Sequence, residues 1–262
     1  RKKFLEDHPY LDFFIVGEGE IPSCNIIQNY INVGKNIKKL KEIDLVSTIT
    51  LLPDGTMKEG ADAPRIGSKR LPKETYTGQW SILDDRFTAL GDVPSPYVSG
   101  VMDKFFDNHL YPIFETNRGC PFKCTFCQRG GDYFNRTIFR PLDMVKEELD
   151  YITHHIVSDS PGVGRLECAD SNFAMFQQDL EICEHLRELQ DKYSYPHYLN
   201  ATTGKNKPEL IIEATSKLKP NSIVISNSIQ SKNTDTLEAI KRSNISLEKY
   251  SMVQDQVQRR GL

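Results

Sequence analysis

The stretch CPFKCTFC, residues 120–127, places three cysteines on one short loop with the spacing C-x3-C-x2-C. It follows residues 113–117, which we expect to form a β-strand. Three thiolates on one loop can hold three irons of a [4Fe–4S] cube and leave the fourth iron without a protein ligand. A small molecule can bind at such an open iron, so this loop predicts a catalytic site.

Two other kinds of metal site also use cysteine loops. A structural zinc ion needs four protein ligands, and the nearest candidates for a fourth are His154, His155 and Cys168. The two histidines fall on a predicted helix and Cys168 falls inside a predicted strand. An electron-transfer cluster normally takes a fourth cysteine, and none lies near the loop in sequence. The spacing favours a cluster with an open iron, while a non-catalytic zinc or electron-transfer module stays open as the rival of another class.

The order of strand, three-cysteine loop and helix resembles the radical S-adenosylmethionine (SAM) superfamily. Phe126, the aromatic residue before the last cysteine, also matches that family's pattern. The resemblance implies that Cys120, Cys124 and Cys127 are the metal ligands of a [4Fe–4S] cluster whose open iron binds SAM. It also implies that Phe126 lies against the SAM adenine. An electron from the cluster would then cleave SAM to methionine and a 5′-deoxyadenosyl radical.

The composition is that of a globular protein with a sizeable core. The chain has 262 residues, of which 38% are hydrophobic and 26% are charged. No apolar run approaches the ~20 residues that span a bilayer, and a net charge of −3 gives no case for nucleic-acid binding. The remaining cysteines are scattered and do not suggest a disulfide framework, so we expect the reducing cytoplasm. Of these, Cys24 and Cys183 are expected to be small core residues.

The first third of the chain differs from the rest. Residues 1–34 contain an apolar run at 11–16, a glycine-rich turn and a helix, which together make one βα unit. This run resembles the close of the cobalamin-binding, Rossmann-like domain that precedes many radical SAM domains, so residues 1–34 are expected to be its C-terminal remnant. Residues 35–110 are expected to be an irregular linker with a short hairpin around Asp54 and Gly55. The chain begins at Arg1 and ends just after a helix, and we expect a fragment truncated at both ends.

Residues 111–262 repeat strand, loop and helix. The predicted strands span residues 113–117, 163–170, 195–202 and 222–228, and predicted helices begin near residues 141, 176, 208 and 246, with a short one around 237–240. Four successive βα units predict an α/β fold with a parallel sheet. Together with the resemblance, they imply a partial (βα) radical SAM barrel, preceded by the end of the Rossmann-like domain and the linker.

Polar residues follow the predicted strands, at the strand ends where parallel α/β barrels form their active sites. Asp170 and Asn172 follow the second strand, Asn200 lies near the end of the third, and Gln230 follows the fourth. By resemblance, Asp170 and Asn172 stand where many family members bind the SAM amino group, although their Asp-x-Asn-Phe form departs from the common motif. The segment around Gln230 resembles the family's Gln-Ser motif, which implies that Gln230 reaches the SAM ribose or carboxylate. Residues 241–244 resemble the family's Arg-x-Asn helix end. We expect these four residues and Phe126 to bind the cofactor, whereas loop capping is the alternative role for such side chains.

The resemblance implies a cobalamin-dependent methyltransferase that acts on an unactivated carbon. One SAM would give the radical, and methylcobalamin would deliver the methyl group. A radical cyclisation, rearrangement or dehydrogenation is the alternative, because a fold does not fix a reaction. The implied partners are a small-molecule or natural-product substrate and an electron donor such as flavodoxin or ferredoxin. The sequence identifies neither the substrate nor a catalytic residue.

Overall fold

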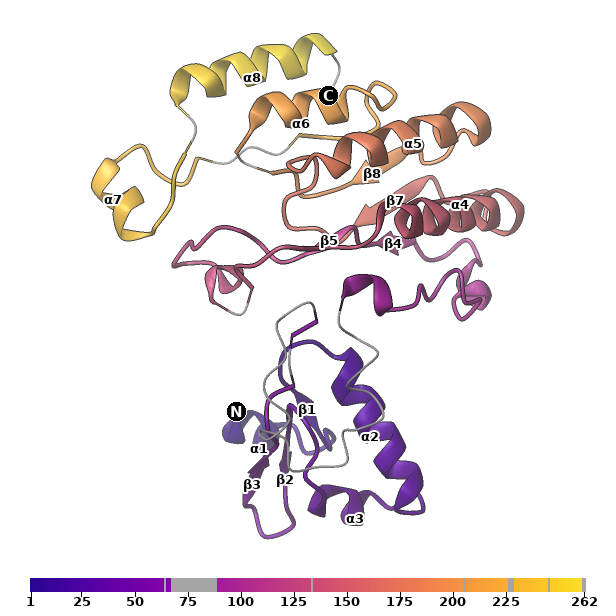
Figure 1. The fold of residues 1–262 in the computed structure, drawn as a ribbon, viewed down its shortest axis with the longest axis vertical. Coiled ribbons are helices and arrows are strands. Elements are labelled where there is room, and N and C mark those ends of the chain that lie inside the picture. The colour runs from indigo at the N-terminus through magenta and orange to yellow at the C-terminus, as the bar shows by residue number, and fades with distance from the viewer. Residues whose placement is uncertain are drawn as a thin grey trace. The chain divides into compact units, whose positions relative to one another are not determined.

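The computed structural model describes residues 1–63, 65–66, 89–132, 134–204, 206–225, 229–244 and 246–260, without the side chains of Leu247 and Arg260. The chain divides into two compact units, Arg1–Asp92 and Val93–Leu262 (Figure 1). The cysteine loop belongs to the second unit. Much of the predicted linker, at residues 67–88, and the end of the predicted fourth strand, at 226–228, lie outside the described residues.

The first unit is built around a three-stranded antiparallel sheet in the order β1-β2-β3. Its described elements are α1 (Lys2–Asp7), β1 (Phe14–Ile15), α2 (Glu20–Asn32), α3 (Ile37–Glu42), β2 (Thr48–Leu51), β3 (Met57–Glu59) and a 3-10 turn at Leu90–Asp92. The predicted hairpin is confirmed as β2 and β3. Its turn is closed by Thr56 N, which donates to Asp54 Oδ1 (2.8 Å), and Gly55 has φ 79°, a conformation that favours glycine. The hairpin pairs with β1, so it shares a sheet with the predicted βα unit.

Cys24 on α2 is exposed, so its predicted burial is wrong. Helix α2 instead buries Ile21 and Asn25, and Asn25 Oδ1 accepts a hydrogen bond from Val46 N (3.3 Å). Cys24 lies on another face of the helix with Ile27, which is 59% exposed. Sequence periodicity shows that a helix has apolar positions, but tertiary packing decides which of them are covered.

The second unit is α/β, with three parallel strands in the order β4-β7-β8. Its strands are β4 (Ile113–Phe114), β5 (Asn117–Arg118), β6 (Ile138–Phe139), β7 (Arg165–Cys168) and β8 (Tyr198–Asn200), and its helices are α4 (Leu142–Asp159), α5 (Gln178–Tyr193), α6 (Pro208–Thr215), α7 (Thr234–Ala239) and α8 (Leu247–Arg260), with 3-10 turns at Asp103–Phe105 and Gln128–Gly130. The predicted parallel sheet and the predicted helices are confirmed. In the described part of the predicted fourth strand, one parallel bridge joins Ile223 to Leu199.

Alternate strand residues of the sheet point into the helical core. Phe114, Leu166 and Leu199, one from each parallel strand, are at most 2% exposed, whereas Ile113 beside Phe114 is 53% exposed. Helices α4, α5, α6 and α8 lie in one row in chain order, and α7 lies apart from that row (Figure 1). Cys183 on α5 is fully buried in this core, which confirms its predicted role.

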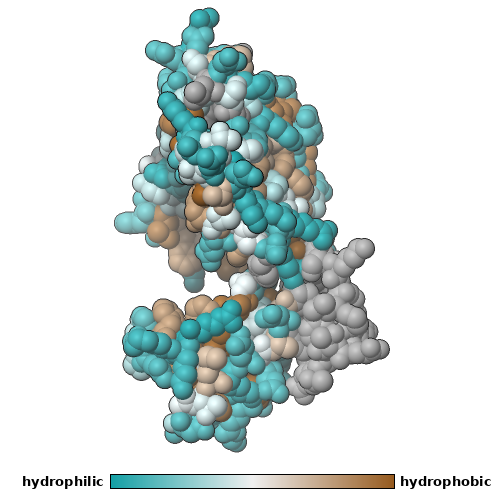
Figure 2. Space-filling model, turned by 90° about the vertical axis from the view of Figure 1, so that its left-hand side faces the viewer, coloured by the Kyte–Doolittle hydropathy of each residue, from teal (hydrophilic) through white to brown (hydrophobic). Residues whose placement is uncertain are grey.

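The described helices include none that is long and apolar enough to cross a membrane. Hydrophilic side chains cover much of the face shown in Figure 2, and apolar side chains gather between them in small patches.

Two residues of α4 test whether its inner face carries the stability of the second unit. Ile152 is fully buried in the core, and Val157 on the same helix is 44% exposed. We expect Ile152→Ala to lower the free energy of unfolding by about 2–5 kcal/mol, because it removes buried contacts and leaves a cavity. Val157→Ala, the matched control, should change it by about 0.5 kcal/mol or less. Denaturant unfolding measures both, and equal effects would contradict this packing.

Candidate functional site

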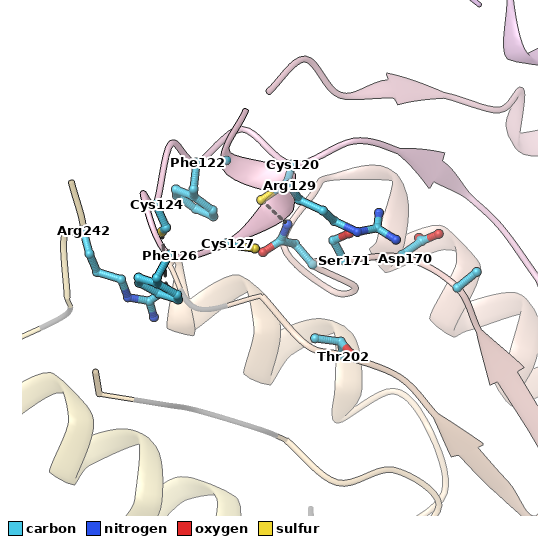
Figure 3. A pocket seen from close by; sticks show the side chains of 13 residues that line it. Cys120, Phe122, Cys124, Phe126, Cys127, Arg129, Asp170, Ser171, Thr202 and Arg242 are labelled. Atoms are coloured by element: carbon cyan, nitrogen blue, oxygen red, sulfur yellow. Dashed lines mark hydrogen bonds between the residues drawn. The ribbon is translucent and has the colours of Figure 1, made fainter. Parts of the chain in front are cut away.

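The three cysteines line one pocket of about 290 Å³ at the end of the parallel sheet (Figure 3). Cys124 is buried, Cys120 is half-buried and Cys127 is exposed. Asn172 and Thr202, from the loops after β7 and β8, line the same pocket. The thiols therefore meet the ends of the parallel strands, where the sequence predicts the active face.

Two glycines allow the cysteine loop to fold tightly. Cys127 N donates to Cys124 O (3.1 Å), and Gly130 N donates to Cys127 O (2.9 Å). A Cβ atom on Gly130 would lie 2.2 Å from Cys124 O, so the backbone approaches too closely for any side chain. Gly119, just before the first cysteine, has φ 113°, a conformation that L residues rarely adopt. The local sequence therefore fixes how the three thiols are presented.

Asp170, just after β7, ties the segment before the cysteine loop to the sheet. Its carboxylate accepts hydrogen bonds from Thr116 N (2.9 Å), Asn117 N (3.3 Å), Asn117 Nδ2 (2.8 Å) and Thr116 Oγ1. Asp170 is 3% exposed, so these bonds are shielded from water. Because these two backbone N–H groups donate to a side chain instead of a neighbouring strand, the predicted strand at 113–117 splits into β4 and β5.

Burial sets the ionisation of the acidic groups in this region. It raises the pKa of Asp170 to about 6, against the lowering effect of the bonds from Thr116 and Asn117. The folded pKa lies above the usual 3.8, so the stabilising contribution of this group is fully present below about pH 4 and is lost as the pH rises through about 6. Burial likewise raises the pKa of Asp179 to about 7, and the nearby Asp170 charge adds to the effect.

The candidates for a fourth zinc ligand are all engaged elsewhere or poorly suited. Burial raises the pKa of the Cys168 thiol well above its usual range, which disfavours the thiolate that a metal needs. His154 Nε2 lies 2.9 Å from the Tyr193 hydroxyl, and His155 Nδ1 lies 2.7 Å from Asp159 Oδ2. None of these three candidates is therefore suited to be a fourth ligand beside the three thiols of the cysteine loop.

Within the described part of the chain, no three or more His, Cys, Asp or Glu side chains form a group that could hold a metal ion.

The structure brings together part of the predicted cofactor-binding set. Phe126, Asp170 and Asn172 line the cysteine pocket, with Phe126 and Asp170 at its opposite ends in Figure 3. Asn200 and Gln230 are not among the described residues that line it. Asn200 Nδ2 instead donates to Glu167 Oε2 (2.6 Å), and Gln230 is exposed. The contacts of all five with SAM stay predictions.

Arg242 lines the pocket and contacts a cluster cysteine, and sequence reasoning did not place it in the site. Its Nη1 lies 3.8 Å from Cys124 Sγ, although the two residues are 118 positions apart. The contact exists because Thr125 N donates to Ile240 O (3.1 Å), which holds the end of α7 against the cysteine loop. The Arg-x-Asn resemblance marked this segment, but nothing local in the sequence indicated its neighbour.

Comparison with known proteins adds an independent line of support. No family model matches the chain. The 2-(S-pantetheinyl)-carbapenam-3-carboxylate methyltransferase of Streptantibioticus cattleyicolor is 28% identical over 260 residues, which cover 96% of this chain and 33% of the relative. The cobalamin-dependent radical SAM methyltransferase TokK of Streptomyces tokunonensis is 28% identical over 261 residues, with the same coverage. Over nearly its whole length the chain is therefore similar in sequence to a cobalamin-dependent radical SAM methyltransferase.

A solved structure has a fold similar to that of this chain. The cobalamin-dependent SAM radical enzyme OxsB, with aqua-cobalamin and SAM bound, superposes with a TM-score of 0.60 at 16% identity. The match covers 98% of this chain and 33% of OxsB. It confirms a mixed α/β fold with a parallel sheet like that of radical SAM enzymes. The chain spans about a third of the length of the curated relatives it matches.

The two neighbouring glycines after the cysteine loop give a matched test of its geometry. In Gly130→Ala the new methyl group would clash with the backbone of Cys124, whereas in Gly131→Ala it would lie 3.5 Å from Gln128 O, an ordinary contact. We expect Gly130→Ala to destabilise the loop by about 1–3 kcal/mol and to lower the iron held after anaerobic reconstitution. Gly131→Ala should keep its iron. Equal iron contents in the two variants would contradict the close approach.

Proposed function

We propose that this chain forms the cluster-binding core of a radical SAM enzyme. Cys120, Cys124 and Cys127 would hold a [4Fe–4S] cluster, and SAM would bind the iron that lacks a protein ligand. When bound, the cluster supplies the electron that cleaves SAM reductively to methionine and a 5′-deoxyadenosyl radical.

The observation that carries the proposal is the donor set of the pocket. Three thiols line it. Of the described candidates for a fourth protein ligand, Cys168 has a thiol pKa raised well above its usual range, and the two histidines are paired with other side chains. A structural zinc site and a four-cysteine electron-transfer cluster both need that fourth ligand. A site with one open iron does not.

Four other residues that line the pocket have roles within this proposal. Asp170 fixes the approach to the loop through Thr116 and Asn117. Phe126 is 55% exposed on the pocket wall, where an aromatic ring offers a stacking surface for a flat base. Thr202 and Arg242 add polar groups that can orient the polar parts of a ligand.

For the whole protein we propose a cobalamin-dependent methyltransferase that acts on an unactivated carbon of a small-molecule or natural-product substrate. The support is the function of the two curated relatives, each of which this chain covers over 33% of its length. The proposed parts of this chain are the end of a Rossmann-like cobalamin domain at residues 1–34, a linker at 35–110, and the first four βα units of a radical SAM barrel at 111–262. A one-electron donor such as flavodoxin or ferredoxin, in a reducing compartment, completes the proposal.

The proposal of cobalamin rests on the relatives and on the resemblance of residues 1–34, and not on an assigned cobalt ligand. His8 is the one histidine in residues 1–92. Its Nδ1 lies 2.7 Å from Phe4 O, and its ring stacks on Phe4 at 4.3 Å between ring centroids. It is thus engaged in local contacts, and we assign no residue of the first unit to a cobalt ligand.

Anaerobic reconstitution of the whole protein tests the proposed function. We expect about four irons per protein, as a single cube requires, and formation of 5′-deoxyadenosine from SAM under reducing conditions. Stoichiometric zinc without SAM cleavage would instead establish the non-catalytic zinc module, and iron without cleavage would indicate an electron-transfer cluster.

Two single-cysteine variants check which thiols carry the cluster. Cys124→Ala should abolish both the cluster and SAM cleavage, because Cys124 is one of three ligands. Cys24→Ala, at an exposed cysteine of the first unit, should leave both unchanged. SAM cleavage by Cys124→Ala would show that the ligand assignment is wrong.

A further inference from the structure

Two side chains from outside the cysteine loop donate N–H groups to its thiols. Asn172 Nδ2 donates to Cys120 Sγ at 3.3 Å, which the dashed line at Cys120 marks in Figure 3. Arg242 Nη1 donates to Cys124 Sγ at 3.8 Å. The first donor is a neutral amide and the second a guanidinium that stays charged at any relevant pH. The two thiols that they reach are both assigned cluster ligands.

The backbone around Asn172 is fixed on both sides. Asp170, two residues before it, holds Thr116 and Asn117 through its buried carboxylate. Phe173, the next residue, is fully buried, and its N donates to Thr202 O (2.9 Å). Asn172 itself is 3% exposed. Its amide is therefore preorganised toward Cys120 and shielded from water, which strengthens a hydrogen bond to an anionic sulfur.

Arg242 is held by its own segment. Its backbone N donates to Leu237 O (2.9 Å), and its Nε donates to Asn244 Oδ1 (3.3 Å). The bond from Thr125 N to Ile240 O ties this segment to the cysteine loop. These hydrogen bonds consequently hold the positive charge of Arg242 beside Cys124.

We propose that Asn172 and Arg242 raise the reduction potential of the cluster through N–H···S hydrogen bonds to Cys120 and Cys124. The inference rests on the proposed function, because it requires the cluster. In the step concerned, one electron from an external one-electron reductant enters the oxidised cube, and no bond forms or breaks. The added negative charge is shared with the thiolate sulfurs, so donors and positive charge beside them stabilise the reduced form more than the oxidised form.

Electron paramagnetic resonance (EPR) during a redox titration of the reconstituted whole protein measures this effect without turnover. At the midpoint potential of the wild type, the ratio of reduced to oxidised cluster should fall about tenfold in Asn172→Ala, which for a one-electron couple is a downward shift of about 59 mV. Arg242→Gln should shift the midpoint in the same direction. Arg242→Lys keeps the charge without the planar fork and should shift it less.

Matched controls separate a local effect from a general one. Asn32→Ala, at an exposed asparagine on α2, and Arg259→Gln, at an exposed arginine that pairs with Asp255 on α8, should keep the wild-type midpoint. If Asn172→Ala holds no iron, Asn172→Ser takes its place, because its side chain stays polar but is too short to make the same contact.

The redox titrations and the iron contents together distinguish three outcomes. Lower midpoints at unchanged iron content support the inference. Wild-type midpoints in the Asn172 and Arg242 variants, each with a full complement of iron, would overturn it and leave the proposed function intact. A wild-type protein that assembles no four-iron cluster would overturn both, and that result is visible before any variant is compared.

Discussion

The candidate site depends on one buried carboxylate. Asp170 follows a central strand of the parallel sheet, and its oxygens receive hydrogen bonds from the backbone and side chains of Thr116 and Asn117. These residues lead directly into the cysteine loop. Burial of the carboxylate raises its pKa to about 6, so the ionised group is held at some cost to the folded state. In return, the hydrogen bonds to this carboxylate fix the sheet and the cysteine loop to each other just before the first thiol.

Three segments far apart in sequence meet around the thiols as a result. The cysteine loop supplies the ligands, the loop after β7 supplies Asn172, and the end of α7 supplies Arg242. Each segment is held by hydrogen bonds to backbone groups, which keep their geometry more rigidly than flexible side chains would. A cofactor bound here would meet a preformed set of donors, and preorganisation of this kind is how proteins tune the chemistry of a cofactor.

The sequence predicted what is local and missed what is tertiary. The cysteine spacing defines its site within eight residues, and helices such as α4 and α5 follow from the periodicity of their apolar residues. The exposure of Cys24 and the contact of Arg242 with Cys124 depend on how distant segments pack, and no local pattern encodes them. Asn200 shows the same limit. It ends a parallel strand as the sequence predicted, yet its amide is bound to Glu167.

The central claim is that the three thiols leave one iron open to SAM. Mössbauer spectroscopy of the protein reconstituted with iron-57 tests it most directly, because it distinguishes iron sites by their ligands. The account predicts that about a quarter of the iron, one site of the cube, changes its signal when SAM is added, while the other three sites stay unchanged. A spectrum with four equivalent sites that does not respond to SAM would contradict the account.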